Sequence, residues 1–287
     1  MNDWYLFSLI ALVLFGLQRF LYKVSAEEGC NSAITTLAFM GTVTCLSTLF
    51  FLFSRGTINN TSFLVGISIV NGLSFLTGTL ASMEALKRIP ATTVLPLIRL
   101  NTLLVVLFGI FYFGDKLSMY QYGGIVISLA VIITLARFSP ALPSAGQRET
   151  GSGIVYAAVA LVAGAVAAVS SAFAALSVDK LAFMALSYLF GTVFSFALYH
   201  RRAFTGSAVM VRKAVGIGIC IGIINFAGFY ALLHALATGP VSVIIPATGL
   251  YFVIAVLLSV VVYREKLDVI RFSALVMTVA AVILLRL

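Results

Sequence analysis

The stretch Ile89–Leu117, IPATTVLPLIRLNTLLVVLFGIFYFGDKL, decides how the rest of the chain is interpreted, because it occurs twice. The stretch Gly239–Leu267, GPVSVIIPATGLYFVIAVLLSVVVYREKL, lies 150 residues later and repeats both prolines. Each stretch also ends with an acidic residue followed by lysine and leucine, which we call the acid-Lys-Leu exit. The same offset relates residues 65–135 to residues 215–285 without a gap. Shared hydrophobicity alone does not keep prolines and charges in step over 71 positions. The sequence therefore predicts two copies of one membrane unit.

The composition indicates an integral membrane protein. Of the 287 residues, 62% are hydrophobic and 9% are charged, and the mean hydropathy is +1.14. That leaves too little polar surface to cover a water-soluble globule of this length. The interior of a bilayer is about 30 Å thick and needs about 20 apolar residues per helix. The segments expected to span it are residues 3–23, 32–54, 63–86, 91–113, 118–137, 153–176, 181–199, 214–236, 241–263 and 267–286.

These ten segments divide into two halves. Residues 1–138 form the first five-helix repeat, residues 139–152 form a linker rich in proline, serine, glycine and charge, and residues 153–287 form the second repeat. An odd number of spans per repeat means that the second copy enters the membrane from the opposite side. We therefore expect an all-α membrane protein of ten transmembrane helices, arranged as two inverted repeats of five.

The lysines and arginines between the spans indicate how the chain is oriented. One side of the membrane carries four of them and the other side carries eleven, with the loop at residues 201–213 the most basic. By the positive-inside rule, the side with eleven is cytoplasmic and both termini point outward. The position of the basic residues in these loops explains the net charge of +9 by membrane orientation, so we expect no nucleic-acid partner.

Two features of the repeat resemble the EamA-type branch of the drug/metabolite transporter superfamily. They are the proline inside the fourth and ninth spans and the acid-Lys-Leu exits Asp115–Leu117 and Glu265–Leu267. The resemblance covers nearly the whole chain and implies a secondary carrier of small metabolites, often exporting amino acids. It implies a central cavity bordered largely by spans 1, 3, 4, 6, 8 and 9. The chain departs from the pattern at Phe15-Gly16, where Trp-Gly is common, and the family usually has cytoplasmic termini.

Arg99 is the residue that breaks the internal symmetry, because Gly249 occupies its position in the second repeat. It lies nine residues after Pro90, which places it about 13 Å into the membrane. An arginine there costs at least about 2.5 to 3.5 kcal/mol, so it faces a cavity or a partner. We expect Arg99 to bind an anionic group of the substrate. The alternative is an internal contact with a backbone carbonyl or with Glu84, for which Arg19 competes.

Other polar residues in the spans that are expected to border the cavity complete the predicted substrate site. Each of them is also explained by a hydrogen bond between helices, which is a common use of polar groups in membrane proteins. The substrate-binding candidates besides Arg99 are Gln18, Asn71, Ser74, Asn101, Asn225, Tyr230, Thr248 and Tyr251, and further polar groups there are Thr77, Ser170 and Ser171.

Two pairs of residues at equivalent repeat positions suggest how transport is coupled and gated. Glu84 and His234 are candidates for proton coupling, because a desolvated carboxyl group or imidazole can change charge near neutral pH. Both residues also lie near the ends of their spans, where contact with lipid headgroups and water would explain them without a role in proton coupling. Pro96 and Pro246 each remove one helical hydrogen bond, so they are candidate hinges or static kinks.

Small residues recur at helix-packing spacing in spans 6 and 8. Ala160, Gly164, Ala168 and Ala172 follow one another at steps of four, and Gly218, Gly222 and Asn225 continue one face. Such residues let helix backbones approach closely in lipid. We expect these faces to pack against other helices.

We therefore predict a secondary active transporter of a small metabolite, such as an amino acid or another carboxylate, with export across the cell membrane by alternating access. It is expected to act as a monomer in the bilayer, with the proton as coupling ion and without a cofactor or metal. A flippase of a lipid-linked sugar or phosphate is the alternative. An intramembrane enzyme is a remote alternative, because the chain has two histidines and one acidic residue deep in a span. No catalytic residue is predicted.

Overall fold

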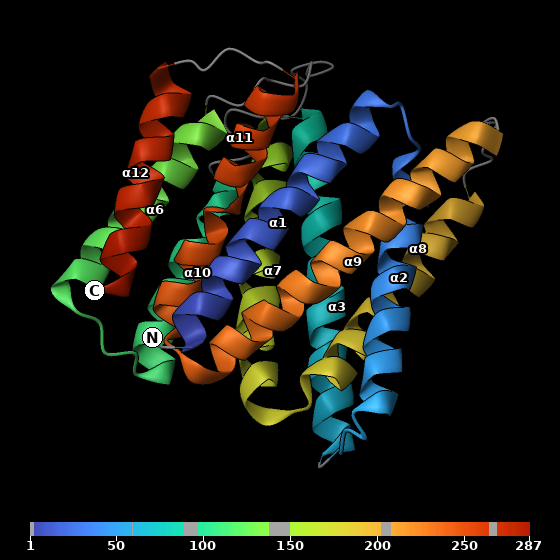
Figure 1. The fold of residues 1–287 in the computed structure, drawn as a ribbon, viewed down its shortest axis with the longest axis horizontal. Coiled ribbons are helices and arrows are strands. Elements are labelled where there is room, and N and C mark those ends of the chain that lie inside the picture. Colours follow the sequence, from blue (N-terminus) through green and yellow to red (C-terminus); the bar gives the residue numbers. More distant parts are fainter. Residues whose placement is uncertain are drawn as a thin grey trace.

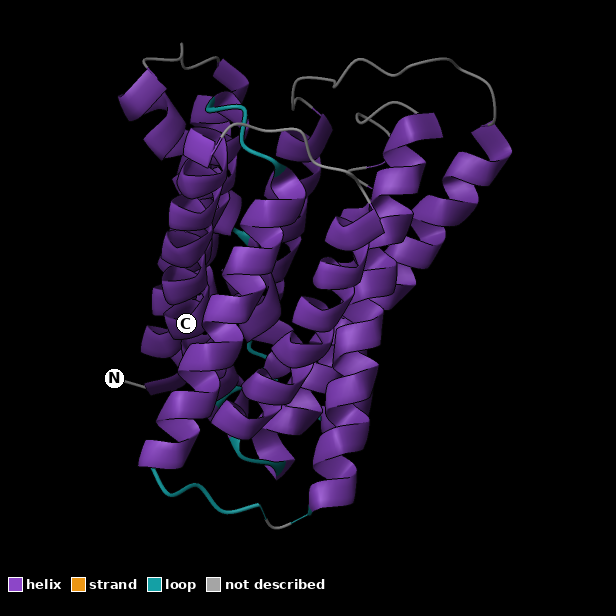
Figure 2. Cartoon of the chain, turned by 90° about the vertical axis from the view of Figure 1, so that its right-hand side faces the viewer, coloured by secondary structure: helices purple, strands orange, loops and turns teal. Residues whose placement is uncertain are grey.

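The computed structural model describes residues 3–58, 60–88, 94, 97–137, 150–201, 208–263 and 269–287. The regular structure of these residues is helical and contains no strands (Figure 2). The elements are α1 Asp3–Glu27, α2 Ser32–Phe53, α3 Thr61–Arg88, α5 Asn101–Phe108, the π-helix η1 Gly109–Phe113, α6 Met119–Arg137, α7 Thr150–Ser177, α8 Lys180–Arg201, α9 Ala208–Thr238, α10 Val241–Gly249, α11 Tyr251–Tyr263 and α12 Val269–Arg286. Most of the predicted linker, Pro96, and the acid-Lys-Leu exit of the second repeat lie outside the described residues.

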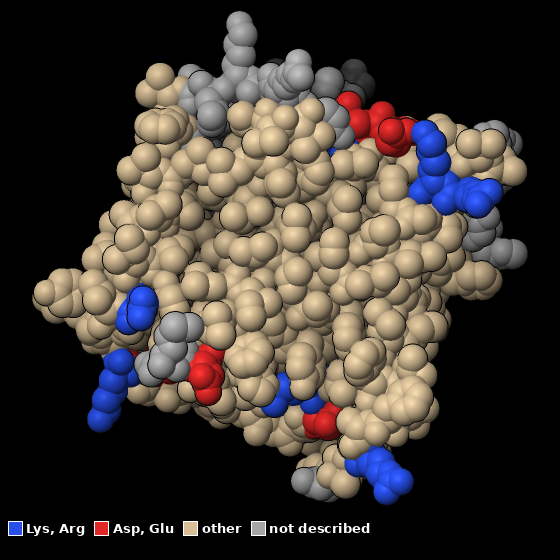
Figure 3. Space-filling model, in the orientation of Figure 1, with Lys and Arg blue, Asp and Glu red and all other residues tan. Residues whose placement is uncertain are grey.

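The helices have the length and composition of membrane spans. Within the described residues, six helices are long and apolar enough to cross a bilayer, and four shorter apolar helices occupy the remaining predicted segments. On the face shown in Figure 3, the described charged side chains lie toward the two ends of the helices and leave an uncharged band between them. Large apolar side chains such as Val126 and Phe196 are 66% and 57% exposed, which suits a surface that faces lipid. The chain is therefore a multi-pass membrane protein.

The two halves pack on one another in reciprocal pairs of helices (Figure 1). By their order in the repeats, α7, α8 and α9 correspond to α1, α2 and α3. Helix α3 packs on α7 as α9 packs on α1, and α2 packs on α9 as α8 packs on α3. Counterparts α2 and α8, and α6 and α12, also pack on each other. Reciprocal contacts of this kind are what a two-fold relation between two similar units produces.

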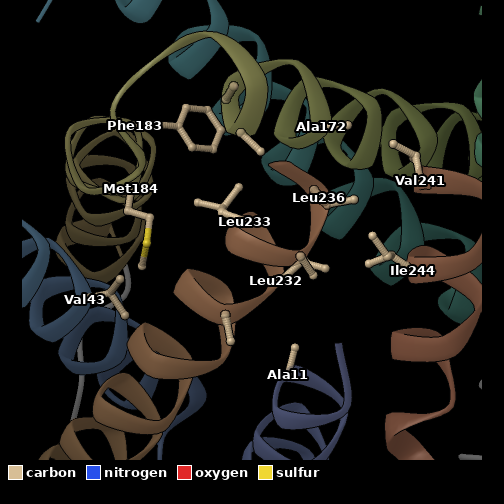
Figure 4. Packing of buried hydrophobic residues seen from close by; sticks show 14 of the residues in the cluster. Ala11, Val43, Ala172, Phe183, Met184, Leu232, Leu233, Leu236, Val241 and Ile244 are labelled. Atoms are coloured by element: carbon tan, nitrogen blue, oxygen red, sulfur yellow. The ribbon is translucent and has the colours of Figure 1, made fainter. Parts of the chain in front are cut away.

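The small residues of span 8 allow close contact between α9 and α2, as expected from the sequence. A Cβ atom added at Gly218 would lie 2.6 Å from the carbonyl oxygen of Thr35 in α2, and one added at Gly222 would lie 2.5 Å from the Cβ atom of Thr42. The main apolar cluster lies beside this contact and joins α8, α9 and α10, with Phe183, Leu233 and Ile244 fully buried (Figure 4).

The fourth and ninth spans are not continuous helices. The ninth is divided at Leu250, whose backbone N–H donates to the carbonyl of Ala247 at 3.2 Å, three residues back. The fourth is interrupted at Leu100, the N-cap of α5, in the same way. Pro246 lies inside α10, four residues before the break. A proline disturbs the helical turn before it, so Pro246 does not directly explain a break that comes after it. The breaks therefore fall at equivalent repeat positions, directly after Arg99 and Gly249, and proline alone does not place them.

Asp115, the acidic residue of the first acid-Lys-Leu exit, forms hydrogen bonds with the second repeat. Asp115 Oδ2 accepts hydrogen bonds from the backbone N–H of Ser242 at 2.8 Å and from its hydroxyl at 2.7 Å. Ser242 lies in the first turn of α10, where backbone N–H groups lack partners within the helix and a carboxylate is electrostatically favoured. Gly109 permits this approach, because a Cβ atom there would collide with the Ser242 hydroxyl. The end of span 4 is thus fixed to the start of span 9.

Candidate functional site

Two arginines from different helices converge on Tyr251, the first residue of α11 after the break in span 9. Arg19 of α1 donates a hydrogen bond from Nη2 to the Tyr251 hydroxyl at 3.1 Å, and its guanidinium carbon lies 5.3 Å from the ring centroid. The guanidinium carbon of Arg99 lies 5.5 Å from the same centroid. Both distances are those of cation–π contacts. We call these three residues the arginine–tyrosine site.

Gly16 brings Arg19 into this position. A Cβ atom at Gly16 would lie 2.4 Å from the Cβ atom of Ile254 and 2.7 Å from the backbone oxygen of Tyr251, so α1 and α11 touch at this glycine. Arg19 follows one helical turn later on the same face of α1. The contact therefore turns a residue in the middle of α1 toward the break in span 9.

Glu84 is not within ion-pair distance of either arginine of the site, which argues against the alternative that Glu84 is the internal partner of Arg99. Its Oε2 atom lies 2.5 Å from Nη1 of Arg88, four residues later on α3. That guanidinium also lies over the ring of Tyr156, 4.5 Å from the centroid. The pair forms because residues at this spacing are neighbours on one helix face. Among the described residues, no carboxylate lies within ion-pair distance of Arg19 or Arg99.

A buried chain of hydrogen bonds adjoins the arginine–tyrosine site. Asn225 donates to Oε1 of Gln18 at 3.0 Å and accepts from the hydroxyl of Tyr188 at 2.6 Å. Gln18 donates in turn to the hydroxyl of Tyr22 at 3.0 Å, and the guanidinium carbon of Arg19 lies 5.7 Å from the Tyr22 ring centroid. Two of the predicted site residues, Gln18 and Asn225, are thus bonded to each other and connect α1, α8 and α9 beside the two arginines.

Asn71 belongs to a separate polar group between α3 and α7. Its Nδ2 atom donates to the backbone oxygen of Ala167 at 2.8 Å and to the hydroxyls of Ser170 and Ser171 at 2.9 and 3.0 Å. All three side chains are buried. This geometry is that of a hydrogen bond between packed helices, and it does not place Asn71 beside the arginines.

The remaining substrate-binding candidates are dispersed. Asn101 lies against α7, because a Cβ atom at Gly164 would come within 2.6 Å of its Nδ2 atom. Thr248 is buried and donates to the carbonyl of Ile244 in its own helix at 2.8 Å. Ser74 is half-buried in α3, and Tyr230 is exposed on α9. Of these residues, Asn101 is the closest in sequence to Arg99.

The candidates for proton coupling have different neighbours. Glu84 is paired with Arg88 as described above, whereas the ring of His234 stacks at a tilt on Phe7, with centroids 4.3 Å apart. The ring of Tyr230 lies 6.4 Å from the same histidine. Of the two hinge candidates, Pro246 is buried in α10, and Pro96 lies outside the described residues.

Sequence reasoning missed two tyrosines of the polar chain. Tyr22 follows Gln18 by four residues, so helical spacing already places both side chains on one face of α1. Tyr188 belongs to span 7, which was not counted among the spans that border the cavity. Its contact with Asn225 depends on how α8 packs against α9, which the sequence pattern does not specify.

The arginine–tyrosine site is suited to binding an anion. A guanidinium group that stacks on an aromatic ring through its face keeps N–H donors in its plane, where carboxylates and phosphates bind. Arg19 retains an exposed surface, while Gly16 and Gln18, which precede it on α1, are buried. The arrangement offers positive charge and hydrogen-bond donors to a ligand.

Comparison with known proteins gives a family and a fold. A model of the EamA-like transporter family matches residues 2–137 and residues 151–287. The match in both halves agrees with a two-repeat architecture. A solved structure described only as a crystal structure of a protein is similar, with a TM-score of 0.76 and 21% sequence identity over 98% of each chain. At that identity the similarity concerns the fold alone. Among curated proteins, none matches the sequence.

Proposed function

The chain belongs to the EamA-like transporter family, and from this premise we propose that it is a secondary active transporter that exports a small metabolite across the cell membrane. The substrate is an amino acid or another compound that carries a carboxylate or comparable anionic group. The observation that carries this proposal is the convergence of Arg19 and Arg99 on Tyr251 at the break in span 9. Among the described residues neither arginine has a carboxylate partner, and an unbalanced arginine in a membrane span is costly, so a bound anion would stabilise the site.

Alternating access supplies the mechanism that we propose. Ten spans in two inverted repeats would let one bundle rock against the other around a site at their interface. The reciprocal packing of α3 on α7 and of α9 on α1 supports such a relation. The arginine–tyrosine site joins elements of both repeats, since Arg19 and Arg99 precede the linker and Tyr251 follows it. Rocking of the repeats would therefore change the surroundings of a bound anion.

A counterflow assay tests the proposed function. Purified protein is reconstituted in liposomes loaded with an unlabelled compound, and entry of the same labelled compound is followed for a panel of amino acids and other carboxylates. We expect saturable counterflow for at least one compound, and its loss when the carboxylate is replaced by an amide or ester. The Arg99→Gln variant is expected to lose this counterflow. Counterflow of neutral compounds only, or of none, would contradict the proposal.

The orientation in the membrane gives a separate prediction. From the excess of lysine and arginine on one side, we expect the loop at residues 201–213 to be cytoplasmic and the C-terminus to lie outside. Both termini lie at one end of the bundle (Figure 1), so one reporter orients the whole chain. A reporter that is active only in the cytoplasm should stay silent when fused after Leu287. An active fusion would show the orientation that is usual for the family.

The prolines of the broken spans are expected to affect turnover more than binding. Replacing Pro96 and Pro246 together by alanine restores helical hydrogen bonding and stiffens both spans, which slows interconversion of the two access states. The exchange rate in the counterflow assay should fall, while ligand affinity changes by no more than about three-fold, roughly 0.65 kcal/mol. Pro143→Ala in the predicted linker is the matched control. Equal losses of affinity and rate would indicate a distorted site instead of a hinge.

A further inference from the structure

The charge balance of the arginine–tyrosine site carries an inference about the substrate, one that rests on the proposed function. Two guanidinium groups lie on one tyrosine ring, at 5.3 and 5.5 Å from its centroid. Within the described part of the chain, the contacts of Arg19 and Arg99 are with tyrosines, and no carboxylate lies beside either of them. The acidic residue that the sequence offered for this role, Glu84, is paired with Arg88. The site therefore holds two positive charges, and no carboxylate of the described residues lies within ion-pair distance of them.

The geometry leaves the donors of both arginines available to a ligand. A guanidinium group has five N–H donors, which lie in its plane. Both groups contact the Tyr251 ring, and Arg19 gives one hydrogen bond to the Tyr251 hydroxyl. Both guanidinium carbons lie within 5.5 Å of the same ring centroid, which brings them close enough for one extended small molecule to contact both. Arg19 is exposed although Gly16 and Gln18, which precede it on α1, are buried, so part of the Arg19 side chain is accessible from outside the protein.

We propose that the transported substrate is a dianion, either a small dicarboxylate or a phosphate monoester, bound between Arg19 and Arg99. A monoanion would leave one guanidinium group unbalanced inside the membrane, which is costly. A zwitterionic amino acid would in addition bring an ammonium group toward two arginines. A dianion balances both charges and gives each guanidinium group an anionic oxygen. The inference narrows the proposed anionic substrates to those with a net charge of −2.

The test compares ligands that differ in charge but little in shape. Purified protein in detergent is titrated with unbranched dicarboxylates of three to six carbons, with their monomethyl esters, with glycerol phosphate and with zwitterionic amino acids. The shift in melting temperature gives each dissociation constant, because a ligand that binds the folded state stabilises it. We expect at least one dianion to bind at least ten-fold more tightly than its monoester. The amino acids are expected to bind more weakly than the monoester.

Two single variants show whether the discrimination comes from this pair. Arg19→Gln and Arg99→Gln each leave one cation, so each should bind the dianion and its monoester with affinities that differ less than three-fold. Arg212→Gln, at an exposed position near the start of α9, is the control and should keep the ten-fold difference. The melting temperature of each variant without ligand shows that it is folded.

The outcomes separate this inference from the proposed function. If monocarboxylates or amino acids bind as tightly as every dianion and show counterflow that depends on Arg99, the dianion proposal is wrong and the transporter proposal stands. If no anion of any charge binds or exchanges, both are wrong. A ten-fold preference for the dianion that persists in Arg19→Gln and in Arg99→Gln would also overturn the inference, because the two positive charges would then not be its source.

Discussion

Arg99→Gln is expected to weaken substrate binding by about thirty-fold to several-thousand-fold, which corresponds to about 2 to 5 kcal/mol. The reason is the loss of a charge-assisted contact with the anionic group of the ligand. Arg99→Lys keeps the charge but loses the flat fork of donors, so we expect an affinity between those of the wild type and the glutamine variant. Titration of the tightest anionic ligand against the three proteins measures this order.

The stability of the same variants separates a ligand-binding arginine from a structural one. Arg99 contacts the Tyr251 ring, and among the described residues it has no carboxylate partner. Removing an unbalanced charge from the membrane interior should therefore leave the melting temperature unchanged or raise it. A fall in melting temperature of the kind seen when a buried ion pair is broken, with affinity kept, would contradict the assignment.

Gly16→Ala is expected to destabilise the protein by about 1 to 3 kcal/mol and to weaken anion binding, because it adds volume to a closely packed contact. The new Cβ atom would lie 2.7 Å from the backbone oxygen of Tyr251, which cannot turn away as a flexible side chain can. Separation of α1 from α11 would then move Arg19 away from the Tyr251 hydroxyl. Melting curves and ligand titration of the variant measure both effects.

Gly66→Ala is the matched control for this substitution. Gly66 also lies inside a helix, but no heavy atom lies within 4 Å of a Cβ atom added there. Because alanine is favoured over glycine inside a helix by about 0.5 to 1 kcal/mol, the control should be as stable as the wild type or slightly more stable. Equal behaviour of the two variants would show that the contact at Gly16 does not position α1.

The sequence was sufficient to predict the helices and the two-repeat organisation. Apolar runs bounded by loops identify helices without knowledge of their packing, and the repeat of two prolines and an acid-Lys-Leu exit shows the duplication. The small residues Gly218 and Gly222 also predicted a packed face correctly, since residues without long side chains have few other uses in lipid.

The partners of charged and polar side chains could not be predicted in the same way. Depth along a helix suggested Glu84 as the partner of Arg99, but Arg88 reaches Glu84 along its own helix. The chain from Gln18 through Asn225 to Tyr188 depends on the rotation of three helices about their axes. The break at Leu250 depends on local backbone geometry four residues after the proline that drew attention to the span.

A double-mutant cycle of Arg99→Gln and Glu84→Gln tests most directly whether Arg99 serves the substrate. Melting temperature and anion affinity are measured for the wild type, both single variants and the double variant. We predict that Arg99→Gln loses affinity, that Glu84→Gln does not restore it, and that the coupling energy in stability is close to zero, since the two residues are not paired. Recovery of stability and affinity in the double variant would show that Arg99 mainly balances Glu84, and would contradict its assignment as a substrate residue.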